Sequence, residues 1–192
     1  MDEREQKTEE TRRLPQLRTL EHRYADICWT HKVHEKQADI CFQWHSLLST
    51  LDCFFSVATT VGIFVFVKDC LPQWRCWIEI ISMITSCIAV IIAILLKQLD
   101  FEGRAYQHKN AAVHFLCIRN RLQQMIADFE SNLRPVENIR ATFLEAEKQI
   151  QILYETVPQT TEKALAAAEK ALKEDYEASY SPEEIDRLLR IK

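Results

Sequence analysis

Two long apolar segments, separated by nine residues, constrain this chain more than any other feature. The first, residues 46–67, contains a single charged residue, Asp52. The second, residues 77–97, contains one acidic residue, Glu79, and ends at Lys97. A helix needs about 20 consecutive apolar residues to cross a hydrocarbon core of about 30 Å, and both segments are long enough. We therefore predict an all-α membrane protein built around a transmembrane helical hairpin.

The scarcity of glycine excludes several classes of enzyme. Gly62 and Gly103 are the only glycines among 192 residues. A dinucleotide-binding fingerprint or a P-loop needs several neighbouring positions without a Cβ, so neither can be built here. The chain also has no HExxH motif and no Ser or Cys nucleophile with an evident base nearby. We expect no catalytic residues, no cofactor and no metal.

The distribution of charge predicts orientation and partners. The net charge is −4, and no basic patch with interleaved aromatic residues is present, which argues against nucleic acid as a partner. The connection between the spans, residues 68–76, contains the turn former Pro72 and two Lys or Arg residues. The flanks are slightly richer in basic residues: Lys32, Lys36, Lys97, Arg104 and Lys109. This positive-inside bias places the connection outside and both termini in the cytoplasm of a two-pass protein of the cell inner membrane.

Two of the seven cysteines are candidates for a disulfide. Cys70 and Cys76 share the external connection, where an oxidising compartment would allow a disulfide. Their spacing is equally compatible with two free thiols. The remaining five are expected to act as small apolar residues.

Hydrophobic positions alternate by three and four residues on both sides of the spans, which predicts long amphipathic helices. We expect a charged, disordered N-terminus over residues 1–14 and a cytoplasmic helix over residues 15–45 that continues into the first span. A cytoplasmic helical hairpin follows over residues 98–157, its second helix starting at the signal Pro135. Residues 158–192 read as a loosely attached helical tail with a docking or inhibitory role. The heptads favour a helical bundle or coiled coil and a homo-oligomer.

Equal rise per residue allows helices that leave the membrane together to be compared by depth. His31, His34 and His108 are predicted to lie at similar depth on facing seams. A histidine cluster of this kind could bind a metal, sense pH or form a polar layer that sets register, and the polar layer is the interpretation we favour because no further ligand completes a metal set. By the same reasoning, Asp26 is expected to offset the charge of Arg119.

Both spans carry polar residues at helical spacing. The predicted stripes consist of Ser49, Asp52, Ser56, Thr59 and Thr60 in the first span and Glu79, Ser82 and Ser86 in the second. Small polar residues can simply allow close packing of helices. The two carboxylates favour a lining role instead, because an ionisable group in a bilayer needs water, a cation or a partner. In an oligomer, Asp52 and Glu79 would form acidic rings near opposite mouths of a pore.

The layout resembles the SLATT family, two-transmembrane effector domains associated with nucleotide-signalling and antiviral conflict systems of bacteria. The resemblance covers roughly residues 15–155. It is carried by the architecture and by Arg23, Trp29, Ala38, Ala111, Ala112, Val113, His114 and Leu122. It implies a membrane effector without enzymatic activity that oligomerises and forms a pore or disrupts the bilayer when a partner sensor is triggered, causing growth arrest or cell death. The alternative is a non-conducting anchor or adaptor that recruits a partner through its coiled coil.

Overall fold

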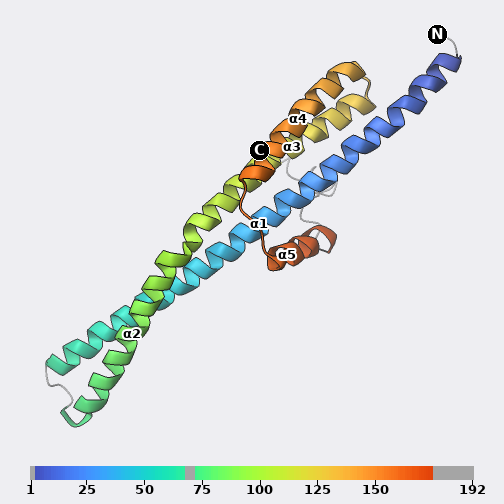
Figure 1. The fold of residues 1–192 in the computed structure, drawn as a ribbon. Coiled ribbons are helices and arrows are strands. Elements are labelled where there is room, and N and C mark those ends of the chain that lie inside the picture. Colours follow the sequence, from blue (N-terminus) through green and yellow to red (C-terminus); the bar gives the residue numbers. More distant parts are fainter. Residues whose placement is uncertain (1–2, 68–71, 175–192) are drawn as a thin grey trace, which may run out of the picture. The chain divides into compact units, whose positions relative to one another are not determined.

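The computed structural model describes the backbone of residues 3–67 and 72–174, and the regular elements in these ranges are all helical (Figure 1). In chain order they are α1 (Glu3–Val67), the short 3-10 helix η1 (Pro72–Trp74), α2 (Arg75–Leu99), α3 (Phe101–Glu130), α4 (Val136–Thr156) and α5 (Glu162–Lys173). They divide into two compact units, which we describe separately. The bundle unit comprises Met1–Ala38 and Gln107–Lys192, and the hairpin unit comprises Asp39–Tyr106.

Helix α1 is 65 residues long and contributes to both units. It begins at Glu3, so the expectation of a disordered segment over residues 1–14 is wrong for the backbone described there. The segment is rich in Glu, Arg, Lys and Gln, which are strong helix formers and can alternate favourably at spacings of three and four residues. Pro15 lies inside the helix, where it removes one backbone N–H donor without ending the helix.

The core of the bundle unit lies between α1, α3 and α4. Ile27 of α1, Phe115 and Leu122 of α3 and Ile150 of α4 are the largest fully buried side chains. They occupy the alternating hydrophobic positions of the sequence, and they form one contiguous cluster. Leu20, Met125, Phe129 and Ile139 extend this cluster along the bundle. Burial of apolar surface between amphipathic helices is therefore the main stabilising term in this unit.

Helices α2 and α3 are separate helices rather than one continuous helix. The interruption lies at Asp100, a non-glycine residue with φ 43° and ψ 50°. Asp and Asn tolerate this left-handed conformation better than most residues. The Asp100 carboxylate accepts a hydrogen bond from the Gly103 N–H at 3.1 Å and so caps the start of α3. Gly103 is therefore part of the cap and not the point of interruption.

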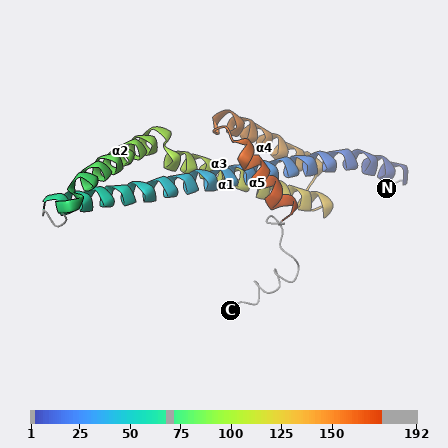
Figure 2. The ribbon, with the colours of Figure 1, turned by 90° about the horizontal axis from the view of Figure 1, so that it is seen from below.

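Helix α5 is docked in the bundle unit, so the description of a loosely attached tail is wrong for its first part. Ala164, Ala168 and Ala171 recur on one face and are at most 1% exposed. Alanine brings two helices close together because its side chain is small. Figure 1 shows α5 beside α1, and in the view of Figure 2 α5 crosses α1. Residues 175–192, the remainder of the predicted tail, lie outside the described residues.

The hairpin unit contains the two apolar segments. Helices α1 and α2 are long and apolar enough to cross a membrane, judged by length and composition. Their large side chains are mostly exposed in the single chain, including Phe54 at 65% and Met83 at 63%. Ile92 is the one buried residue of α2. A surface of this kind is compatible with lipid rather than water as the surrounding solvent.

Candidate functional site

The two spans meet through small and hydroxyl-bearing residues. Thr59 of α1 donates a hydrogen bond to Thr85 of α2, with 3.0 Å between the two hydroxyl oxygens. Thr85 in turn donates to the Ser82 carbonyl at 3.0 Å. A Cβ at Gly62 would collide with the Ser82 side chain, so the glycine permits the close approach of the helices at this level. Gly62 therefore lies on the face of α1 that packs against α2.

The predicted polar stripes do not form a single surface. Asp52, Thr59 and Ser82 are half-buried, and the hydrogen bond of Thr59 places this edge of the stripe toward the neighbouring span. Five other members of the predicted set are exposed: Ser49, Ser56, Thr60, Glu79 and Ser86. In each span the polar stripe therefore extends around more of the helix surface than the face that contacts the other span. Thr85, which the sequence analysis omitted, completes the inter-span contact.

The two carboxylates of the spans have different surroundings. Glu79 pairs with Arg75 one turn earlier in α2, with 3.5 Å between Nε and Oε1. The second acidic group, Asp52, forms no ion pair with any residue the structure describes. Asp52 lies six residues inside the apolar segment, about 9 Å at the helical rise of 1.5 Å per residue. Of the two groups, Asp52 is therefore the one whose charge must be stabilised by water, a cation or another chain.

In the bundle unit, two of the three predicted histidines are in direct contact. The Nδ1 atoms of His34 and His108 lie 3.1 Å apart, and both side chains are buried. One ring must donate and the other must accept, so the contact requires at least one neutral imidazole. Burial, and secondarily the neighbouring His108, lowers the pKa of His34 to about 4. The His34 ring also stacks on Phe115, at 5.5 Å between centroids.

His31 lies outside this hydrogen-bonded pair. It is half-buried, and burial lowers its pKa; the carboxylate of Glu35 opposes this shift, and the cation of Arg119 adds to it by a smaller amount. Arg119 also acts electrostatically on Tyr24 and Cys28 of α1. The described geometry therefore joins His34 to His108 directly, and His31 takes no part in that hydrogen bond.

The predicted pairing of Asp26 with Arg119 is wrong. In the described part of the chain these two residues form no ion pair, and Asp26 instead lies 3.9 Å from Arg23 on its own helix. Equal distance from the membrane specifies height along a helix but not direction around it. Asp26 precedes the core residue Ile27 by one position, which turns its side chain by about 100° away from the seam.

Several polar contacts between helices were not predicted from sequence. Arg23 of α1 donates two hydrogen bonds to the Glu147 carboxylate of α4, at 2.6 and 2.5 Å, and the hydrogen bond to Glu147 raises the pKa of Arg23. Gln37 accepts hydrogen bonds from the backbone N–H and the hydroxyl of Thr161, at 2.9 and 2.7 Å. Thr161 is also the N-cap of α5. Arg23 is one of the residues that carry the resemblance to the SLATT family, and this is the one sequence signal for these contacts.

Two further expectations concern disulfide and metal binding. Cys70 lies outside the described residues, so the predicted pair Cys70–Cys76 stays a prediction. Among the described residues, no group of three or more His, Cys, Asp or Glu side chains is arranged to hold a metal ion. The histidine pair supplies only two nitrogen ligands.

The described chain combines a helical bundle with two helices that are long and apolar enough to cross a membrane, as expected of a two-span helical membrane protein. The sequence profile of the SMODS and SLOG-associating 2TM effector domain family 4 matches residues 17–184, and the chain belongs to this family. Members of the SLATT group are associated with SMODS and SLOG nucleotide-signalling conflict systems and are regarded as membrane effectors rather than enzymes. No curated protein and no solved structure matches the chain.

Proposed function

We propose that several copies of this chain assemble in the cell inner membrane, with both termini in the cytoplasm, and form a cation-favouring pore when a partner sensor is triggered. Opening of the pore would dissipate ion gradients and arrest growth or kill the cell. The partner would be a nucleotide-signalling protein, in keeping with the systems to which the family belongs. The bundle unit would receive the signal.

The observation that carries the proposal is the surroundings of Asp52. This carboxylate lies within an apolar span without a cationic partner among the described residues, and Ser49 and Ser56 are exposed close to it on the same helix. Exposing these polar side chains to lipid is unfavourable in free energy, so contact with water or with another copy of the chain would stabilise them. A ring of Asp52 carboxylates near one mouth would attract cations, and Glu79 would act near the other mouth.

The proposal is tested by reversal potentials in planar bilayers with asymmetric potassium chloride, using the full chain and its Asp52→Asn variant. We expect the wild type to conduct with a preference for potassium over chloride. Loss of the carboxylate ring should reduce this preference severalfold. Asp39→Asn is the matched control, because Asp39 is exposed on α1 outside the apolar segment.

Two outcomes would contradict a pore lined by Asp52. The first is a conductance whose ion preference is the same in Asp52→Asn and wild type. The second is the absence of conductance at every protein-to-lipid ratio and in the presence of the partner. The second result would favour the alternative function, a non-conducting anchor that recruits a partner through the bundle unit.

A further inference from the structure

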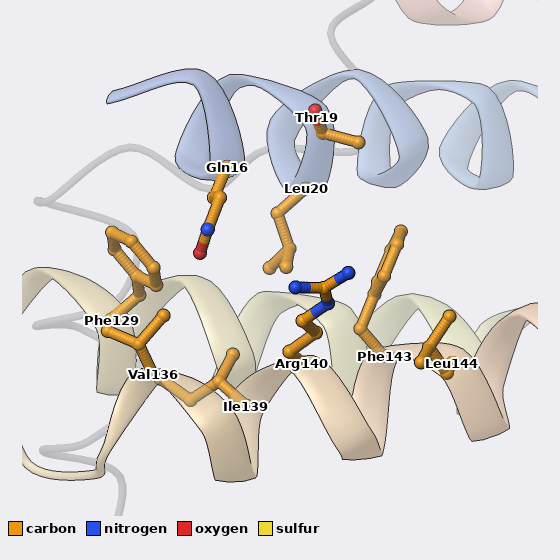
Figure 3. Close-up of a pocket in the computed structure, with 9 residues that line it drawn as sticks. All are labelled: Gln16, Thr19, Leu20, Phe129, Val136, Ile139, Arg140, Phe143 and Leu144. Carbon is orange, nitrogen blue, oxygen red and sulfur yellow. The ribbon is translucent and has the colours of Figure 1, made fainter. Parts of the chain in front are cut away.

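The bundle unit contains an open apolar groove of about 370 Å³ between α1, the end of α3 and the first half of α4 (Figure 3). Its walls are mainly aliphatic and aromatic: Leu20, Phe129, Val136, Ile139, Phe143 and Leu144. Leu144 is 54% exposed at the edge of the groove, and its neighbour Arg140 extends toward α1 in the close-up. Such a surface is suited to an amphipathic helix that brings two or three apolar side chains and an acidic group.

The end of α5 points the chain toward this groove. The start of α5 is held at Gln37 through Thr161, and its end lies at Trp29, where the Lys173 ammonium is 6.0 Å from the ring centroid. From its start to its end, α5 therefore runs toward the N-terminal end of α1, where Leu20 lines the groove. From Trp29 to Leu20 the distance along α1 is nine residues, or about 14 Å at 1.5 Å per residue.

The chain beyond α5 is long enough to reach the groove and has a matching sequence. Residues 175–192 follow the described part, and an extended chain spans about 3.3 Å per residue, so residues 175–181 alone could cover about 23 Å. The following residues begin with Ser181 and Pro182 and place Glu184 three positions after Ser181, which is a helix-start signature. An apolar face then recurs at helical spacing: Ile185, Leu188 and Leu189.

The charge at the start of the segment complements that of the groove, although three basic residues toward its end make residues 182–192 neutral as a whole. Arg140 is the one cationic residue that lines the groove, and it forms no ion pair within the described part of the chain. The segment carries Glu183, Glu184 and Asp186 around the start of its predicted helix. An acidic residue near this start is also favoured by the helix dipole. We propose that residues 182–192 dock as a helix into the groove formed by α1, α3 and α4, with Leu188 and Leu189 against its apolar wall and an acidic side chain at Arg140.

This contact would connect the C-terminal segment to the first helix of the bundle unit. The inference rests on the groove and on the course of α5, and it does not depend on pore formation.

The proposal is tested by hydrogen–deuterium exchange of the full-length protein in detergent micelles, followed by mass spectrometry. We expect residues 182–192 to exchange at least about tenfold more slowly than an unstructured peptide of the same sequence, because burial of a single Leu side chain contributes a factor of ten or more. Leu144→Asp should remove this protection. Ile152→Asp should leave it intact, because Ile152 is similarly exposed on the same helix, at 60%, and does not line the groove.

A reciprocal pair of variants tests the segment. Leu188→Ala with Leu189→Ala should accelerate exchange at the start of α4, whereas Arg187→Ala with Arg190→Ala, on the other face of the predicted helix, should not. Three outcomes overturn the proposal. Residues 182–192 could exchange as an unstructured peptide, their protection could survive Leu144→Asp, or their protection could disappear on dilution. The last result would assign the groove to the segment of a second copy.

Discussion

The bundle unit and the hairpin unit use apolar residues in opposite ways. In the bundle unit the largest apolar side chains are turned inward, and Phe115 and Leu122 have no exposed surface. In the hairpin unit the largest apolar side chains are turned outward, as Phe54 and Phe64 show at 65% and 61% exposure. The contact between the two spans is made instead by Thr59, Thr85 and the pair Gly62 and Ser82.

The difference shows which solvent stabilises each unit. Water drives apolar side chains into a shared core, so the bundle unit is stabilised by burial. Hydrocarbon gives no such drive between helices, so the spans associate through close packing and hydrogen bonds between small residues.

The largest expected effect comes from two matched substitutions of phenylalanine. Phe115→Ala should lower the free energy of unfolding by about 3–5 kcal/mol, because it leaves a cavity in the bundle core. Phe64→Ala removes the same atoms from an exposed position and should change it by less than about 0.5 kcal/mol. The measurement is urea unfolding in a mild detergent, followed by circular dichroism. A comparable loss for Phe64→Ala would show that another chain covers the outer face of the hairpin unit.

The second prediction concerns the pH dependence of the bundle unit. His34 has a pKa of about 4 in the folded chain and about 6.5 when unfolded, so the unfolded chain binds more protons between these values. Stability should therefore be complete above pH 6.5 and fall as the pH is lowered toward 4, by up to about 3 kcal/mol from this residue. The measurement is the free energy of unfolding from pH 7.5 to 4.

The comparison that isolates His34 is between two glutamine variants. His34→Gln should reduce the slope of the free energy of unfolding against pH by the equivalent of close to one bound proton. His114→Gln, at an exposed position of α3, should leave this slope as in wild type. Equal slopes in wild type and His34→Gln would be incompatible with a neutral, buried imidazole in the folded bundle.

The smallest expected effect lies in the hairpin unit. Gly62→Ala should weaken the association of the two spans by about 1 kcal/mol, because the added Cβ collides with the Ser82 side chain. Adding Ser82→Ala should recover most of this loss, since the hydroxyl is the atom most closely approached. The measurement is unfolding by sodium dodecyl sulfate in mixed micelles. Additive effects of the two substitutions would mean that the helices do not meet at this level.

Much of the helical architecture could be predicted from patterns that act along one helix. The lengths of the apolar segments predicted the two spans, and the alternation by three and four residues predicted the amphipathic helices whose apolar positions form the bundle core. Pro135 marked the start of α4, which begins at Val136. These signals are readable because each depends on spacing within one segment and on the rise and turn of a helix.

Predictions that required rotation around a helix were less successful. Asp26 and Arg119 were matched in height, yet their side chains do not form an ion pair in the described structure. The predicted polar stripe contains both residues that face the other span, such as Thr59, and residues that do not, such as Ser56. Height follows from counting residues, whereas direction depends on which helix packs against which face.

The sequence by itself determined that the chain is helical, that two segments match a membrane in length and polarity, and that amphipathic helices flank them. Hydrophobic length and period are properties of consecutive residues, so no partner is needed to define them. Only the tertiary structure decided that Arg23 bonds to Glu147, that His34 meets His108, and that the alanine face of α5 is buried in the bundle unit. The two hydrogen-bonded pairs join residues at least 74 positions apart, and the burial of α5 depends on a neighbouring helix. These contacts stabilise the chain only when packing brings the two surfaces together.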